Sequence, residues 1–282
     1  MEPLVSTAWL EAALAEGTVA VLDASLHLPS AERDAAAEFV REHIPGARFL
    51  DIATLTDRSS PVPSALPSPT QFAARLADLG VPPEARIVFY DDSAVRSAAR
   101  AWFMARRAGI EAAILDGGLG KWKAEGRLLE SGDAHASARS ARQPGPMGGA
   151  VRDKSEMLAN CASRAEQVVD ARDGGRFSGA VADAVHGLPG GHIPGARNLP
   201  FTRLFAADGT YKPQEELAEE FRRAGLDLDR PIIASCGSGV TASVLLFALH
   251  LLGHSDNALY DGSWSEWGAD PATPKETGEA RP

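Results

Sequence analysis

The sequence predicts an α/β protein made of two tandem domains, each a parallel sheet flanked by helices. Two observations support this prediction. Short apolar runs alternate with segments of helical length, as in sheets whose parallel strands are joined by helices. Several motifs also occur twice in the 282 residues, at a spacing typical of a whole domain. We therefore expect a first domain over residues 1–132, a linker over 133–149 and a second domain over 150–282.

The repeat is defined by four motifs. The clearest is His-Ile-Pro-Gly-Ala, which begins at His43 and again at His192. The other matched pairs are Asp23 with Asp170, Asp116 with Asp261, and Trp122 with Trp267. Because the last two pairs are both 145 residues apart, the two copies keep one register over that part of the chain. The period is too long for a solenoid, so each copy should fold as a domain.

The elements of the first copy are predicted from its hydrophobic pattern. We expect helices over 7–14, 68–79 and 97–108, and strands over 19–23, 86–90 and 113–115. Ser68 can cap the second of these helices, with Pro69 in its first turn. The continuous apolar runs of the strands indicate a sheet that is covered on both faces. The linker is predicted from its content of Ala, Gly, Ser and Pro.

The overall composition excludes several classes of partner. The formal net charge of −10 argues against nucleic acid or an anionic membrane as the main partner. No apolar run reaches the ~18 residues of a membrane span, and the segment after Met1 lacks the basic and apolar regions of a signal peptide. Two cysteines in so long a chain are not a disulfide framework, and the histidines lack the spacing of metal ligands. We expect a cytoplasmic protein with no metal and no other cofactor.

One loop of the second copy carries the strongest chemical signal. Cys236 follows the buried-strand pattern of residues 231–235, and the apolar helical segment 243–249 begins shortly after it. Gly237 and Gly239 allow the backbone to curl without steric cost. The amides of such a turn, together with a helix N-terminus, favour negative charge. We therefore expect Cys236 to be a reactive thiolate surrounded by amides.

The first copy lacks this chemistry. At the spacing of 145 residues, Asp91 stands opposite Cys236, and Asp92 follows it. Two carboxylates would repel an anion, so the first domain is expected to keep the fold without the catalytic function. The other cysteine of the chain, Cys161, falls on the first helix of the second copy and is interpreted as a small core residue.

Taken together, the motifs resemble one enzyme family. Both copies carry the Asp-Ala, His-Ile-Pro-Gly-Ala and Asp-Gly-(Gly/Ser)-x3-Trp motifs, and only the second has a cysteine in the loop, at Cys236. This combination is similar to the tandem-domain rhodanese and 3-mercaptopyruvate sulfurtransferase family, over essentially the whole chain. The resemblance implies two rhodanese-like domains, the first inactive and the second catalytic.

The resemblance also implies a persulfide mechanism. The Cys236 thiolate would take a sulfur atom from a small-molecule donor and pass it to cyanide, a thiol or a reduced thioredoxin-like protein. The loop residues would bind the substrate sulfur through their backbone amides: Gly237, Gly239, Val240 and Thr241.

Two further sets of residues match family motifs. Ser238 and His43, with Asp34 orienting the imidazole, match a Ser-His-Asp relay that protonates the leaving enolate. His43 has a second interpretation, as a histidine that anchors a turn in the way expected of His192. Arg176 matches the family arginine that binds the anionic group of the donor, and a bidentate arginine suits a carboxylate. The alternative interpretation of Arg176 is an arginine that only forms a salt bridge at the surface.

The loop sequence indicates the donor. Residues 236–241 read Cys-Gly-Ser-Gly-Val-Thr, as in mercaptopyruvate enzymes, whereas thiosulfate enzymes have Arg-Lys after the cysteine. We therefore predict 3-mercaptopyruvate as the donor, with thiosulfate as the alternative. Two features depart from the family. Residues 183–187 lack the second arginine that the family has in this region, so Arg172 or His186 would have to replace that arginine. Leu26 stands where the family has a tryptophan.

Two other functions fit part of the pattern. Cysteine phosphatases also place a cysteine between a strand and a helix, but they need an arginine six positions later, where this chain has Ala242. A sulfur-relay or interaction protein would keep Cys236 and lack a strong donor site. Turnover with mercaptopyruvate or thiosulfate would separate an enzyme from such a relay protein.

Overall fold

The computed structural model describes residues 1–133 and 142–280. Residues 134–141, which belong to the predicted linker, and the last two residues lie outside the described part. The chain forms two compact units. Unit 1 comprises residues 1–57, 66–148 and 206–211, and unit 2 comprises residues 58–65, 149–205 and 212–282. Each unit therefore includes one short segment from the other half of the sequence.

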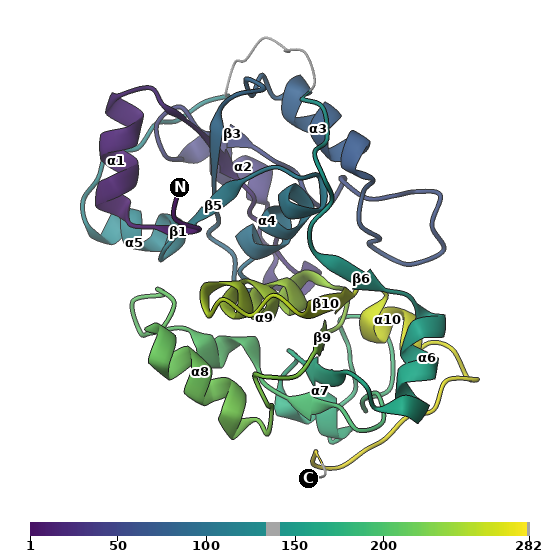
Figure 1. Ribbon diagram of the computed structural model, residues 1–282. Coiled ribbons are helices and arrows are strands. Elements are labelled where there is room, and N and C mark those ends of the chain that lie inside the picture. Colours follow the sequence, from purple (N-terminus) through teal and green to yellow (C-terminus); the bar gives the residue numbers. More distant parts are fainter. Residues whose placement is uncertain (134–141, 281–282) are drawn as a thin grey trace. The chain divides into compact units, whose positions relative to one another are not determined.

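Unit 1 contains a five-stranded sheet with the strand order β1-β5-β4-β2-β3 (Figure 1). Its strands are β1 (Leu4–Val5), β2 (Val19–Asp23), β3 (Arg48–Phe49), β4 (Arg86–Tyr90) and β5 (Ala112–Leu115). All of their pairings are parallel, and Val21 on β2, for example, lies opposite Val88 on β4. The predicted strands 19–23 and 86–90 are confirmed with these bounds, because both are apolar runs in the interior of the sheet.

Helices connect these strands. They are α1 (Thr7–Ala15), α2 (Ala35–Arg41), α3 (Pro69–Asp78), α4 (Ala98–Arg107) and α5 (Gly118–Ala124), with a 3₁₀ helix at Pro29–Ala31. The predicted cap of α3 is confirmed, since the Gln71 amide donates to the Ser68 hydroxyl and the Ser68 amide donates to the Gln71 side chain. Helix α2 is not among the helices predicted from the sequence, and Asp34 caps it by accepting bonds from two of its amides.

Unit 2 repeats this architecture. Its strands are β6 (Ala150–Arg152), β7 (Gln167–Asp170), β8 (Arg197–Asn198), β9 (Ile232–Ser235) and β10 (Asn257–Tyr260), in the order β6-β10-β9-β7-β8. Its helices are α6 (Lys154–Ser163), α7 (Gly174–Ser178), α8 (Gln214–Arg223), α9 (Val240–Leu251) and α10 (Ser263–Trp267), with a 3₁₀ helix at Phe201–Leu204. Helix α9 packs against β9 and β10 (Figure 1). The prediction of two α/β domains with parallel sheets is confirmed.

The repeated His-Ile-Pro-Gly motif has one structural role in both units. In unit 1, the His43 ring stacks on Phe39, and its Nδ1 is 2.7 Å from the Phe39 carbonyl oxygen. In unit 2, the His192 ring stacks on Phe177, with Nδ1 2.9 Å from the Phe177 carbonyl oxygen. Each histidine therefore anchors the turn that follows it to a buried phenylalanine.

Each unit has its own hydrophobic core. The repeated Trp122 and Trp267 are buried in the cores of units 1 and 2. Their ring N–H groups donate to the carbonyl oxygens of Leu128 and Pro274, both at 2.8 Å. Cys161 lies on α6, partly buried against the core of unit 2, which agrees with its interpretation as a core residue.

Candidate active site

Cys236 lies at the C-terminal end of β9, where the chain leaves the sheet and enters α9. Only 2% of its surface is exposed. The carbonyl oxygens of Cys236 and Gly237 accept hydrogen bonds from the amides of Trp264 and Ser265, at 2.9 and 2.8 Å. These bonds fix the cysteine loop to the start of α10.

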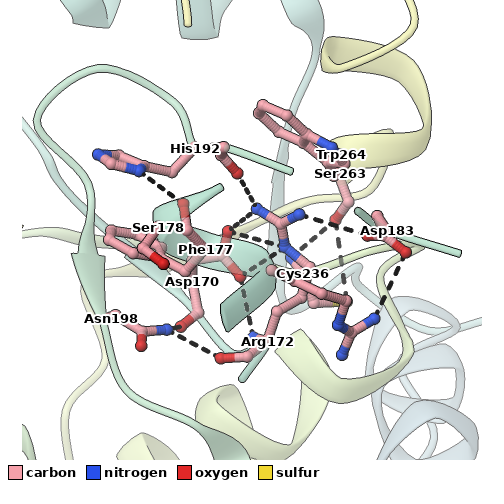
Figure 2. Close-up of polar contacts among 12 residues, drawn as sticks. Asp170, Arg172, Phe177, Ser178, Asp183, His192, Asn198, Cys236, Ser263 and Trp264 are labelled. Carbon is pink, nitrogen blue, oxygen red and sulfur yellow. Dashed lines mark hydrogen bonds and ion pairs between the residues drawn. The ribbon is translucent and has the colours of Figure 1, made fainter. Parts of the chain in front are cut away.

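Ser263 contacts Cys236 directly (Figure 2). Its Oγ accepts a hydrogen bond from the Cys236 amide at 3.1 Å, donates one to the Tyr260 carbonyl oxygen at 2.8 Å, and lies 4.0 Å from the Cys236 sulfur. Its φ of 48° is in the left-handed region, which costs a residue other than glycine about 1–3 kcal/mol. Ser263 is not among the residues predicted from the sequence. The repeat could have pointed to it, because it stands where the first copy has Gly118.

The start of α9 lies next to the cysteine loop. Gly239 caps α9 with a φ of 78°, a conformation that favours glycine. The amides of the first turn, which include those of Val240 and Thr241, have no acceptor within the helix. Together with the helix dipole, they favour an anion at this end of α9. This arrangement would stabilise a negatively charged sulfur on Cys236.

A buried arginine organises the core beside α10 (Figure 2). Arg172 forms ion pairs with Asp170 at 2.7 Å and with Asp183 at 3.3 Å, and it donates to the Gly191 carbonyl oxygen at 2.7 Å. Its guanidinium lies 4.6 Å from the centroid of the Trp264 ring. Because its side chain is fully buried among these partners, Arg172 supports the fold and does not replace the missing second arginine.

Arg176, the predicted donor ligand, lies on α7 with 22% of its side chain exposed. Its Nε donates to Asp173 at 2.5 Å, and its Nη1 is 3.6 Å from Oδ1 of Asp183. Burial acts to raise the pKa of Asp183, but the hydrogen bond and charge of His186 and the charges of Arg176 and Arg172 lower it to about 2. Asp183 is therefore a buried carboxylate that holds Arg172, Arg176 and His186 in place.

His186 is another of the groups bound to Asp183. Its Nδ1 is 2.9 Å from Oδ1 of Asp183, and 16% of its side chain is exposed. The ring lies against Gly237: a β-carbon on Gly237 would overlap Cε1 of the ring and lie 3.0 Å from each ring nitrogen. The fold thus places an imidazole next to the residue that follows Cys236.

The three predicted relay residues occupy different surroundings. In unit 1, His43 is buried, with its Nδ1 on Phe39 and its Nε2 4.0 Å from Glu130. Asp34 accepts hydrogen bonds from amides of α2, and the orientation of His43 comes from Phe39 and Glu130 instead. Ser238 lies in unit 2, partly exposed, in the cysteine loop. The contacts of His43 match its turn-anchoring interpretation, and the relay stays a prediction.

Two features are absent from the described part of the chain. In residues 1–133 and 142–280, no group of three or more His, Cys, Asp or Glu side chains is arranged to hold a metal ion. No helix within these residues is long and apolar enough to cross a membrane.

Comparisons with known proteins find relatives along the whole chain. The Rhodanese-like domain family matches residues 6–125 and 153–270. A 3-mercaptopyruvate sulfurtransferase from Escherichia coli is 40% identical, over 96% of this chain and 97% of its own. A thiosulfate sulfurtransferase from Gallus gallus is 41% identical, over 94% of this chain and 92% of its own.

The fold is also found among solved structures. The crystal structure of SseA from Escherichia coli, described as one of the 3-mercaptopyruvate sulfotransferases, superimposes with a TM-score of 0.84. It is 38% identical to this chain, and the match covers 94% of this chain and 99% of that one.

Proposed function

Because the chain belongs to the rhodanese family, we propose that it takes sulfur from 3-mercaptopyruvate and carries it as a persulfide on Cys236. Its relatives over the whole chain are sulfurtransferases, and so is this protein. The observation that carries the proposal is the position of Cys236, a buried thiol between the end of β9 and the N-terminal amides of α9.

In the first half-reaction, the Cys236 thiolate attacks the sulfur atom of 3-mercaptopyruvate. A sulfur–sulfur bond forms while the carbon–sulfur bond breaks, and the electron pair of the broken bond leaves with carbon as the enolate of pyruvate. The enolate gains a proton and becomes pyruvate. We assign the delivery of this proton to Ser238, whose hydroxyl lies in the same loop.

In the second half-reaction, cyanide or a thiolate attacks the outer sulfur of the persulfide. The bond to Cys236 breaks, and its electron pair restores the thiolate for the next cycle. Amides at the start of α9 would stabilise the anionic sulfur in both states. A thioredoxin-like dithiol protein is the acceptor that we propose in the cell, and a cytoplasmic location stays a prediction. One relative from Arabidopsis thaliana, with 37% identity, is named as mitochondrial.

The choice of donor follows from the charges near the thiol. Residues 237–241 contain no charged side chain, so the loop offers little to balance the second charge of thiosulfate. A keto acid with one carboxylate would need Arg176 and a proton for its enolate. Thiosulfate is the second candidate, because the Gallus gallus relative is named a thiosulfate sulfurtransferase.

The test is thiocyanate formation from cyanide, measured with each donor at the same ionic strength, together with the intact mass of the enzyme after exposure to donor alone. A higher kcat/KM with 3-mercaptopyruvate, and one added sulfur on the Cys236 peptide, would support the proposal. A preference for thiosulfate would favour the second candidate. Sulfur loading of Cys236 without turnover of either donor would indicate a relay protein.

A further inference from the structure

A backbone turn fixes the position of His186. The turn runs from Asp183 to Leu188, whose backbone groups exchange hydrogen bonds of 2.8 and 3.1 Å. The His186 amide adds a bond of 3.1 Å to the Asp183 carbonyl oxygen. Gly187 has a φ of 65°, so the turn favours a glycine directly after His186. The histidine therefore cannot move far without breaking backbone hydrogen bonds.

Asp183 also fixes the orientation of the ring. An ionised carboxylate only accepts hydrogen bonds, so Nδ1 of His186, 2.9 Å from Oδ1, carries a hydrogen. Asp183 has no exposed side-chain surface. In a protonated imidazole both ring nitrogens donate, so a bond from Nδ1 to Asp183 leaves Nε2 for an anionic ligand.

Gly237 packs against the ring of His186. Its φ lies outside the left-handed region, so backbone conformation does not explain the glycine. The lack of space explains the glycine, because a β-carbon would overlap Cε1 of His186 and lie 3.0 Å from Nδ1 and Nε2. The ring edge that carries both nitrogens therefore faces the cysteine loop.

Arg176 and His186 converge on one oxygen of Asp183. Nη1 of Arg176 is 3.6 Å from Oδ1, and Nδ1 of His186 is 2.9 Å from it. Asp183 is fully buried, whereas the side chains of Arg176 and His186 are 22% and 16% exposed. In a chain with a net charge of −10, Arg176 next to His186 forms a local positive site that an anionic donor could reach.

We propose that His186 is the second donor-binding residue, which donates from Nε2 to the carboxylate of the donor, and that Gly237 lacks a side chain to make room for it. The inference rests on the proposed function and names a ligand for the carboxylate of that donor. The sequence offers Arg172 and His186 as replacements for the missing family arginine. In the structure Arg172 is excluded as a replacement because it is buried among its own partners. His186 remains as the candidate, since it is partly exposed next to the cysteine loop.

Steady-state kinetics of three variants test the pair. In His186→Ala, loss of a charge-assisted hydrogen bond should raise KM for 3-mercaptopyruvate about tenfold or more, with a smaller effect on kcat. Gly237→Ala should give a similar rise, because its methyl group displaces the ring from Asp183. The double variant should be no worse than His186→Ala alone, since the two changes remove the same contact. His254→Ala, beyond the far end of α9, is the matched control and should leave KM unchanged.

A second readout does not depend on the donor. In a Cys161→Ser background, the rate of Cys236 alkylation by iodoacetate is divided by its rate with neutral iodoacetamide. The ratio should fall severalfold in His186→Ala and in Gly237→Ala, because the carboxylate of iodoacetate loses its partner while changes in thiol reactivity cancel.

The two readouts separate this inference from the proposed function. A wild type that does not use 3-mercaptopyruvate, but whose alkylation ratio falls on loss of His186, would overturn the proposed donor and keep His186 as an anion ligand. An alkylation ratio unchanged by His186→Ala, or effects of the two substitutions that simply add, would overturn the inference itself.

Discussion

Asp91 and Cys236 occupy equivalent positions in the two units. The carbonyl oxygen of Asp91 accepts a hydrogen bond from the Leu119 amide at 3.0 Å, and that of Cys236 accepts one from the Trp264 amide at 2.9 Å. The Asp91 carboxylate is itself bound by two backbone amides, at 3.1 and 2.7 Å, and burial raises its pKa. Unit 1 thus keeps the loop but fills the place of the thiol with a group that cannot carry sulfur.

The first prediction follows from this difference. Cys236→Ser should abolish sulfur transfer with either donor, because serine cannot form a persulfide, while the circular dichroism spectrum stays that of the wild type. Cys161→Ser should keep most of the activity, since Cys161 lies on α6 against the core. Peptide mass spectrometry after donor treatment would show which cysteine is loaded. Sulfur found on Cys161 alone would contradict the assignment.

The parts of the fold that the sequence predicts best are those set by local pattern. The strands 19–23 and 86–90 match the observed β2 and β4 because continuous apolar runs leave little choice of position. Helix α2 is missed because it is short and buries only Phe39 among its residues. Its cap, Asp34, is a predicted relay residue on the basis of the resemblance alone.

The candidate site, like the fold, has one part that the local sequence predicts and another part that it does not. Cys236 is found because a strand, a glycine-rich turn and a helix follow one another in sequence. The contacts of Cys236 with Ser263, and of Gly237 with His186, join residues that are far apart in the chain. Such contacts depend on how the turn after α7 and the start of α10 pack against the loop, which no local pattern reveals.

The second prediction concerns Arg176. If it binds the carboxylate of the donor, Arg176→Lys loses the bidentate geometry and Arg176→Gly also loses the charge. We expect a loss of roughly 1.5–3 kcal/mol of binding free energy in the glycine variant, seen mainly in kcat/KM, and a smaller loss in the lysine variant. Both donors should be measured. Unchanged kinetics in both variants would show that the arginine only forms its ion pairs with Asp173 and Asp183.

The third prediction concerns the pH dependence of stability at Asp183. Its pKa in the folded protein is about 2, against an ordinary value of 3.8. A carboxylate with a lowered pKa contributes stability that is fully present above its unfolded pKa and is lost as the pH falls towards its folded pKa. Asp183→Asn should therefore destabilise the protein above about pH 5, by roughly 3–5 kcal/mol if it behaves like other broken buried ion pairs. The difference should shrink as the pH falls from 4 to 2.

Urea unfolding of the wild type and of Asp183→Asn at pH 7, 4 and 3 measures this dependence. The exposed Asp229→Asn is a suitable control, because a solvated carboxylate at the surface contributes little to folding. A destabilisation by Asp183→Asn that is the same at all three pH values would contradict the role given to the charge of Asp183.

The fourth prediction concerns Ser238. Ser238→Ala should reduce kcat with 3-mercaptopyruvate more than kcat with thiosulfate. The reason is chemical: pyruvate leaves as an enolate whose carbon must be protonated, whereas thiosulfate leaves as sulfite and needs no such proton. The ratio of the two kcat values, measured in wild type and variant with cyanide as acceptor, isolates this step. Equal losses with both donors would assign Ser238 to the loop structure instead.

The last prediction combines the cysteine loop with His186. Replacing Gly237 by Arg and Ser238 by Lys introduces the Arg-Lys pair typical of thiosulfate enzymes and removes the hydroxyl. In this protein, however, any side chain at position 237 meets the ring of His186. The double variant should therefore lose activity with 3-mercaptopyruvate and gain little with thiosulfate, because the new arginine and the displaced histidine compete for one space. Adding His186→Ala should free that space and raise kcat/KM for thiosulfate above that for 3-mercaptopyruvate. All variants must be compared at one ionic strength, because salt screens such charge effects. A double variant that already prefers thiosulfate as strongly as the triple variant would show that His186 does not restrict the loop.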